Sequence, residues 1–450
     1  MKLLWTLLFY QFCFVVLSAQ EDTNQLDFSL LRQNDKVRID SSKNLYFQLK
    51  EIQFGEKSVL SFGGSHRFQI EGFVNEEFEQ EKDQSDYWFL NRSMLHGHVK
   101  SSDWFEFFVE VNASLISSKT NLAPVDRDEL GVNQAFFDLQ LNKNWSARIG
   151  RQNFRLGSGR LIDVREGPNV RLSFDMIDLT YINKNTKIST FLGGPVRPKA
   201  GIFDNDAVSS DEFISGVYWM QNWSEMFNTD TYMIYKNEED KTWDSGTADD
   251  QRISLGLRYF GDWKGLTYNN EVLYQLGSFG NQSIRAWTIS FDVNRKLEFF
   301  NNHPGVLGVR TELISGDRDS GDNVLNTFDG LYPRGAYFGR VARFGPSNLF
   351  DIHPYVEIEV GEVSLEFDYV AFWRLSTEDG IYGPPLNLAY PDNNDQRFIG
   401  HQIGGIISYS PFKNFSLELE SNVIFPAGFL KDSGLDDHLV HVVFTSEVKF

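Results

Sequence analysis

The last thirteen residues alternate between apolar and polar positions with a period of two. One face would hold Val440, Val442, Phe444, Val448 and Phe450, and the other His441, Thr445, Glu447 and Lys449. This pattern, with an aromatic residue at the chain end, is typical of a membrane strand in a β-barrel. An amphipathic edge strand of a soluble sandwich shows the same alternation over so short a segment, so both interpretations stand at this point.

Similar alternation recurs along the chain, for example at residues 104–117, 363–374 and 415–425. In the first of these, Glu110 lies between the apolar residues Val109 and Val111. A carboxylate facing inward from such a strand needs water or a partner, and the wet lumen of a barrel supplies both. From Gly64 to Phe450 there are roughly 18 alternating segments, within the range of outer-membrane barrels. We therefore predict an all-β fold, a transmembrane antiparallel β-barrel.

The connections between these segments fall into two classes. Short connections are expected at residues 100–103, 261–265 and 411–414, and long polar ones at residues 118–132, 195–211, 237–250, 316–335 and 376–396. The segment Tyr337–Asn348, rich in Gly and Arg, is also interpreted as loop. Short periplasmic turns and long extracellular loops are typical of outer-membrane barrels.

The amino terminus resembles a secretory signal peptide. Lys2 is followed by the apolar run Leu3–Leu17 and by the small residues Ser18 and Ala19, and no later apolar stretch reaches the ~20 residues of a spanning helix. The only cysteine, Cys13, lies inside this segment, so neither a lipid anchor nor a disulfide framework is indicated. We predict a signal peptide at residues 1–19, a periplasmic lead-in at 20–60 and the barrel at 61–450.

Composition agrees with an exported barrel. Mean hydropathy is −0.34, yet aromatic residues make up 15% of the chain, and 40 of its 450 residues are Phe. A barrel places aromatic side chains in girdles at the two lipid interfaces, while lumen-facing polar residues keep the mean hydropathy low. The predicted location is the outer membrane of a Gram-negative bacterium, with lipopolysaccharide and the barrel assembly machinery as expected partners.

Residues 148–185 carry a more specific signal. Within them the run Arg165–Arg171 (REGPNVR) resembles the signature of the alginate-export family of outer-membrane barrels. Residues 60–67 (LSFGGSHR) are similar to the family's first strand, and residues 315–339 to its long loop. The resemblance implies a monomeric barrel of about 18 strands, with an arginine-rich conduit for anionic polysaccharide. It does not identify the solute.

Charge placement supports a conduit independently of the resemblance. Residues 148–171 contain six arginines and two acids, in a chain whose net charge is −20. Arginine offers a rigid fork of donors that suits carboxylates, and a row of such forks can pass an anion along if no site binds too tightly. The predicted conduit residues are Arg67, Arg92, Arg148, Arg160, Arg165, Arg171, Arg310 and Arg334, with Asp138, Asp163, Glu166 and Asp175 as counter-charges. Alternatively, these arginines pair with lumen acids such as Asp138, Asp175 and Asp178 and merely hold an inward loop.

The acidic residues are expected to concentrate in the long connections, including 237–250, where they would meet the divalent cations that bridge lipopolysaccharide head groups. Residues 317–323 have the acidic density of a calcium loop. They fail the EF-hand template, because Asp322 stands where Gly is required and Phe328 where the bidentate Glu belongs. A solvated acidic loop is therefore preferred, with Asp317, Asp319 and Asp322 as weak metal candidates. No cofactor is predicted.

Other function classes find little support. His96 and His98 are spaced to share a strand face but have no evident third ligand, and no motif joins Ser93 to His96 as in a hydrolase. The pI of about 4.8 argues against nucleic-acid binding. Two hypotheses remain for a chain that is not an enzyme. One is a channel for anionic saccharides or other carboxylated solutes, and the other is a plugged structural or surface-binding barrel.

Overall fold

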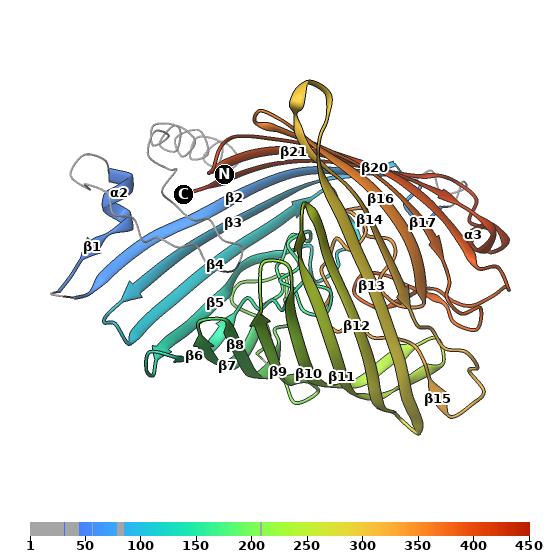
Figure 1. Ribbon diagram of the computed structural model, residues 1–450, viewed down its shortest axis with the longest axis horizontal. Coiled ribbons are helices and arrows are strands. Elements are labelled where there is room, and N and C mark those ends of the chain that lie inside the picture. The colour runs from blue at the N-terminus through green and yellow to red at the C-terminus, as the bar shows by residue number, and fades with distance from the viewer. Residues whose placement is uncertain (1–30, 32–44, 56, 79–84, 208) are drawn as a thin grey trace.

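Eighteen long strands form a closed antiparallel β-barrel (Figure 1). The computed structural model describes residues 31, 45–55, 57–78, 85–207 and 209–450, and the strands are counted within those ranges. The predicted fold class and the expected number of strands are thus confirmed. Within the same ranges, no helix has the length and apolar character needed to cross a membrane.

The wall of the barrel follows chain order. Its strands are β2 (Val59–Val74), β3 (Ser85–Lys100), β4 (Phe105–Ser117), β5 (Asp128–Gln140), β6 (Trp145–Gln152), β7 (Phe174–Asn183), β8 (Thr186–Pro195), β9 (Glu212–Asn222), β10 (Asn228–Trp243), β11 (Gly246–Trp263), β12 (Leu266–Phe279), β13 (Gln282–Glu298), β14 (Pro304–Ile314), β16 (Leu349–Val360), β17 (Val363–Trp373), β20 (Phe398–Phe412), β21 (Phe415–Pro426) and β22 (Leu439–Lys449). Short elements lie outside this series: α2 (Leu45–Lys50), β1 (Ile52–Gln53), η3 (Phe300–Asn302), β15 (Val324–Leu325), β18 (Ile381–Tyr382), β19 (Leu388–Tyr390) and α3 (Gly428–Asp432).

The first and last wall strands close the barrel. Strand β22 pairs antiparallel with β2, and at the chain end Gly64 and Phe450 each donate a backbone N–H to the other's carbonyl oxygen at 2.9 Å. A Cβ atom on Gly64 would come within 2.2 Å of the Met94 carbonyl oxygen and 2.8 Å of the Phe450 ring. The close approach at this seam therefore requires glycine.

Deleting Phe450 is expected to lower the yield of folded barrel, because it removes the aromatic terminus and both of these backbone hydrogen bonds from the seam. Heat-modifiable migration of outer-membrane fractions measures the folded amount. Replacing the exposed residue Phe300, on a turn, by Ser is a control that removes an aromatic ring elsewhere. A deletion variant with wild-type yield would contradict the assigned role of the terminus.

Side chains alternate between lipid and lumen along the wall. On β20, Ile403 and Ile407 are about half exposed on the outer face, whereas Gln402 points inward and is buried. On β22, Val442 is exposed and His441 is buried. A period of two with apolar residues outward is the pattern of a barrel in lipid, so the alternation in the sequence was assigned to the correct faces.

Most connections have the predicted lengths. Residues 264–265 and 413–414 are tight turns at the rim that holds the chain end, whereas residues 196–211, 315–348 and 374–397 are long loops at the opposite rim. The long connection predicted at 237–250 was wrong. Strands β10 and β11 continue through it with a register shift after Glu238, and only residues 244–245 turn. Its acids, among them Glu238 and Asp250, therefore stand in the wall.

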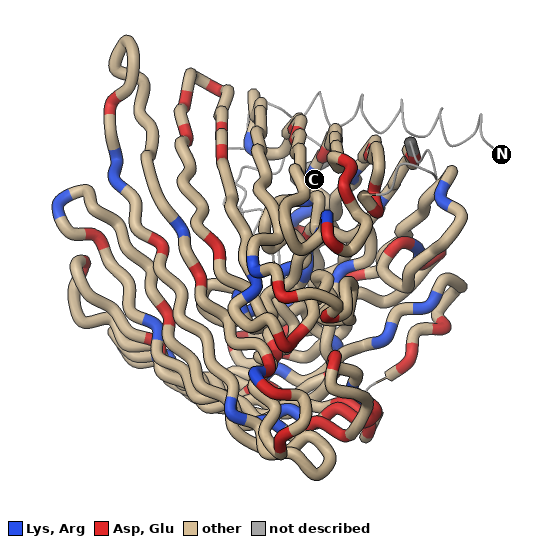
Figure 2. Tube along the Cα trace, turned by 90° about the vertical axis from the view of Figure 1, so that its right-hand side faces the viewer, with Lys and Arg blue, Asp and Glu red and all other residues tan. Residues whose placement is uncertain are grey.

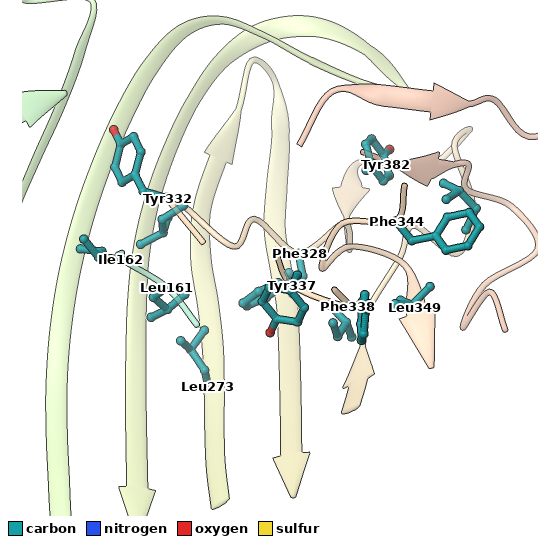
Figure 3. Packing of buried hydrophobic residues seen from close by; sticks show 14 of the residues in the cluster. Leu161, Ile162, Leu273, Phe328, Tyr332, Tyr337, Phe338, Phe344, Leu349 and Tyr382 are labelled. Atoms are coloured by element: carbon teal, nitrogen blue, oxygen red, sulfur yellow. The ribbon is translucent and has the colours of Figure 1, made fainter. Parts of the chain in front are cut away.

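Long loops fold back into the barrel, where Figure 1 shows them crossing the interior. Residues 153–173 and 315–348 meet at a bridge between Ile162 and Tyr332. Apolar side chains from these loops pack with wall residues such as Leu273 in one buried cluster, shown in Figure 3. The apolar core thus lies inside the barrel wall. The segment Tyr337–Asn348 is loop, as predicted.

The predicted domain boundaries are only partly covered. The signal peptide at residues 1–19 lies outside the described residues. Strand β2 begins at Val59, two residues inside the predicted lead-in, and β1 pairs with it through Ile52 and Leu60.

Candidate lumen conduit

Three arginines converge on one carboxylate in the lumen, and we call this group the Glu166 cluster (Arg67, Arg92, Arg171 and Glu166). Arg67 and Arg92 stand directly opposite each other on β2 and β3, an arrangement that like charges disfavour. The inward loop supplies the counter-charge, since the carboxylate of Glu166 forms ion pairs with Arg92 and Arg171. Arg67 donates to the Glu166 carbonyl oxygen at 2.7 Å and to that of Pro168 at 3.0 Å.

Burial makes this cluster electrostatically strong. The side chains of Arg67 and Arg92 are 3% and 1% exposed, whereas that of Glu166 is 34% exposed. Burial raises the pKa of Glu166, but Arg171, Arg92 and Arg67 outweigh burial and hold it well below the ordinary value. Glu166 therefore stays ionised, and its carboxylate marks a place where three guanidinium groups accept an anion.

Arg160, in the same loop, belongs to a second group. It lies 2.7 Å from the carboxylate of Glu312 on β14 and 3.7 Å from that of Glu271 on β12. Tyr337 donates its hydroxyl to Glu312 at 2.7 Å, and Asp351 stands opposite Glu312 on β16. These contacts attach both inward loops to the wall. Arg160 itself is held between Glu312 on β14 and Glu271 on β12.

Arg165 and Arg334 lie where the two inward loops touch. Among the described residues neither forms an ion pair. Arg165 donates to the Pro333 carbonyl oxygen at 3.1 Å and has a positive φ of 56°. The Arg334 guanidinium lies 4.9 Å from the centre of the Tyr337 ring. Both guanidinium groups are enclosed by the loops, and burial lowers the pKa of each.

The remaining predicted residues lie on the wall or beside it. Arg148 forms a two-pronged ion pair with Asp138 at 2.7 and 2.9 Å on the lumen side. Arg151 pairs in the same way with Asp175. These two side chains, however, lie on the outer face of the wall, the same face as the exposed Ile149, and the residues next to them in each strand face the lumen. Asp163 lies 3.6 Å from the Arg155 side chain. Asp175 is therefore a counter-charge on the outer face of the wall.

Arg310 is held by several carboxylates, each at long range. Its guanidinium lies 3.8–3.9 Å from carboxylate oxygens of Asp292, Glu357 and Glu366 and 3.9 Å from the centre of the Tyr355 ring. The side chain is 28% exposed. All three of its ion-pair contacts are long.

Several lumen residues were missed by the sequence analysis. Lys236 lies 3.0 Å from Asp329 of the inward loop, and the fully buried Arg252 pairs with Asp250 at 2.7 Å and donates to the Thr327 carbonyl oxygen at 2.8 Å. The period-two pattern holds over residues 230–238 and again over residues 250–258, and it would have placed Lys236 and Arg252 on the lumen face. The mistaken loop at 237–250 hid this signal.

Arg340, also missed, lies in loop 315–348. It is 2.8 Å from Glu418 and 3.5 Å from Glu420 on β21. Figure 2 shows basic and acidic residues interleaved along the strands and through the inward loops, so the lumen contains charges of both signs.

The weak metal candidates do not form a site. Asp319 and Asp322 are exposed and accept backbone N–H groups of their own turn, whereas Asp317 is only 2% exposed. Within the ranges that the structure describes, no group of three or more His, Cys, Asp or Glu side chains is placed to hold a metal ion. The expectation that this loop is solvated is therefore wrong for Asp317.

His96 and His98 make packing and ion-pair contacts within the wall. His96 stacks against Phe108 with ring centres 5.2 Å apart, and His98 lies 3.0 Å from the Glu106 carboxylate. Ser93 is hydrogen-bonded to His66 rather than to His96. The described residues thus do not join Ser93 and His96 into a hydrolase-like arrangement.

Asp379 joins two long loops and should make their contact sensitive to pH. Its buried carboxylate accepts hydrogen bonds from Asp317 N, Thr327 Oγ1 and the Tyr382 hydroxyl at 2.6–2.7 Å. Burial raises the pKa of Asp379 from near 4 to about 7, so its contribution is complete below the ordinary value and is lost as pH rises through 7. Hydrogen exchange at residues 317–327 should therefore quicken between about pH 4 and pH 7 beyond the intrinsic rate.

The variant Asp379→Asn should flatten that pH dependence, whereas Glu378→Gln, at an exposed neighbouring position, should preserve it. If the Asp379→Asn variant keeps the wild-type pH profile, another group controls the contact.

The match to a protein family decides what this barrel is. The model of the family described as alginate export matches residues 58–438. The chain belongs to the alginate export family. This alginate-export barrel is consequently an outer-membrane channel of a Gram-negative bacterium and not an enzyme. A comparison with curated proteins found no match.

Solved porin structures have the same fold as this alginate-export chain. The crystal structure of Acinetobacter baumannii OccAB1 superposes with a TM-score of 0.58 at 11% identity, covering 90% of this chain and 99% of that one. Pseudomonas aeruginosa OpdQ gives a TM-score of 0.57 at 11% identity and 87% and 97% coverage. Pseudomonas aeruginosa OccK11 (OpdR) gives 0.54 at 13% identity and 90% and 100% coverage. Identities this low support the fold alone.

Proposed function

We propose that this alginate-export barrel passes anionic saccharides or other carboxylated solutes, and that the Glu166 cluster is where their carboxylates bind in transit. The observation that carries the proposal is the convergence of three guanidinium groups on the single carboxylate of Glu166. Each fork has more donors than one carboxylate can occupy, because guanidinium carries five N–H groups. Arg171 is the most exposed of the three at 10%, so a second carboxylate would meet its remaining donors first.

The cluster suits exchange better than permanent binding. A solute carboxylate about 4 Å from one of these guanidinium groups gains about 4 kcal/mol at an effective dielectric of 20, before desolvation. Glu166 competes for the same donors, which weakens retention of the solute. Conduction requires sites that bind and release, and an internal carboxylate that competes for the donors meets that requirement.

Arg310 and Arg340 extend the proposed route beyond the cluster. Both are more than a fifth exposed and are held by wall carboxylates on β17 and β21. Arg148 shares the lumen but is bound in two-pronged fashion to Asp138. We assign it a supporting role. The proposed channel is a monomeric barrel that the barrel assembly machinery inserts into the outer membrane and that lipopolysaccharide surrounds.

A second candidate function rests on the packed interior. Phe328, Tyr332, Phe338 and Phe344 bury their rings between the inward loops and the wall (Figure 3). A barrel filled in this way suits a surface-binding or structural role without transport. Single-channel recording separates the two functions, because only the channel conducts.

Block of the current by an oligouronate tests the proposed solute class. Oligouronate added to wild-type protein in a planar bilayer should interrupt the current, and Arg171→Gln should weaken that block about tenfold, the equivalent of one lost charge-assisted contact of 1.4 kcal/mol. Arg151→Gln makes the same change on the outer face and should leave the block intact. Equal block in wild type and the Arg171 variant would refute the role of the cluster.

A further inference from the structure

The outer surface of the barrel has a pocket that faces lipid and not the lumen. Its volume is about 370 Å³, and it lies where loops 315–348 and 374–397 leave the wall beside β13. On β13 the buried Ala286 points inward, and Trp287 points outward with the exposed Phe291. Trp287 lines the pocket together with Leu375, so the cavity opens to the outer side of the barrel.

The height of this pocket matches the membrane boundary. Just below it, Phe350, Trp373 and Phe398 stack along the outer face at the ends of three neighbouring strands, with ring centres 5.2 and 5.1 Å apart. Aromatic girdles mark the level of the lipid head groups in outer-membrane barrels. A group bound in the pocket would thus lie at the head-group level of the outer leaflet.

Two guanidinium groups line the pocket without a carboxylate partner. The Arg318 guanidinium makes no hydrogen bond or ion pair with any described residue, and that of Arg397 donates only to the carbonyl oxygens of Arg374 and Leu375. In the lumen, by contrast, most of the arginines are neutralised by acids. Glu378 lines the same pocket, so two positive charges face one negative charge.

A third arginine extends the positive surface toward the rim. Arg285 shares the outer face of β13 with Trp287, since it pairs with the exposed Leu276. Hydroxyl groups of Ser376 and Thr377 also line the cavity. Guanidinium forks and hydroxyl donors beside apolar side chains are the groups that bind a phosphate carried on a lipid.

We propose that this pocket binds a phosphate group of the phosphorylated glycolipid in the outer leaflet, with Arg318 and Arg397 as the main ligands. The position beside the aromatic girdle favours a lipid over a soluble phosphate. The proposal does not depend on the solute that the barrel carries.

Native mass spectrometry of the full-length protein, refolded in detergent, tests the site by titration with diphosphoryl lipid A. The double variant Arg318→Gln/Arg397→Gln should bind at least about tenfold more weakly, because two charge-assisted contacts are lost. Lipid A stripped of its phosphates should bind wild-type protein just as weakly. Glu378→Gln should bind as well as wild type or more tightly, since it removes the opposing charge.

The matched control is Lys187→Gln/Arg295→Gln, which removes two cations from the outer face at the opposite rim, where they pair with the exposed Ile182 and Leu307. It should bind lipid A like wild type, and heat-modifiable migration verifies that each variant is folded. Equal binding by the pocket variant and wild type would overturn the site. Displacement of lipid A by low millimolar inorganic phosphate would overturn the lipid as its ligand.

Discussion

Excising residues 329–346 should raise the single-channel conductance several-fold. This segment contains Tyr332, Phe338 and Phe344, which fill the barrel interior, and its removal would leave the wall strands intact. Its ends are close in space, because Ser347 donates its hydroxyl to the Phe328 carbonyl oxygen at 2.6 Å. A short glycine linker can therefore join Phe328 to Ser347 without strain. Planar-bilayer recording measures the effect.

The control excises residues 319–322, an exposed turn of the same loop that bends back on itself through the Asp322 N–H and Asp319 carbonyl contact at 3.1 Å. That variant should conduct like wild type. If excising residues 329–346 leaves the conductance unchanged, the loop does not limit the current.

Neutralising Glu166 should loosen the inward loop more than any other single charge removal. The variant Glu166→Gln leaves Arg67 and Arg92 buried with their shared counter-charge gone, and breaking a buried ion pair costs about 3–5 kcal/mol. Partial exposure of Glu166 places the expected cost at the lower end. Hydrogen exchange of residues 153–173 should accelerate by about two orders of magnitude, which corresponds to about 3 kcal/mol.

Acidification should have the same effect in the wild type. The folded-state pKa of Glu166 is depressed, so its stabilisation is present above the ordinary value near 4.3 and declines as pH falls below it. The variant Glu239→Gln, at an exposed position on β10, is the matched control and should exchange normally. Unchanged protection of residues 153–173 in the Glu166 variant would show that the loop is held by its apolar contacts.

The wall was predictable because its determinant is local. Alternation of exposed and buried positions, as at Ile403 and Gln402, follows from the two-residue period of a strand and from the lipid outside it. The pattern failed at 237–250 because the acids on these strands, Glu238 and Asp250 among them, look like loop residues. They are tolerated in the wall because Lys236 and Arg252 neutralise them across the lumen face.

The partners of the arginines were beyond sequence reasoning. Arg67 and Glu166 are 99 positions apart and meet only because the barrel closes around the loop. Glu166 was assigned from sequence as a counter-charge, and it does form ion pairs with arginines. Asp175 was assigned the same role in the lumen, yet it lies on the outer face with Arg151. Local charge excess marked the segment at 148–171 as unusual, but it could not tell lumen-facing arginines from Arg151.

The reversal potential of single channels in a potassium chloride gradient tests the central claim most directly. If the Glu166 cluster determines the electrostatic potential along the permeation path, the wild-type channel should prefer chloride despite the net charge of −20. The exposed loop acids contribute little because salt screens them beyond about 8 Å. Arg67→Gln/Arg171→Gln should shift the potential toward potassium, whereas Arg151→Gln should not. A wild-type channel that prefers potassium, with no shift in the double variant, would contradict the account.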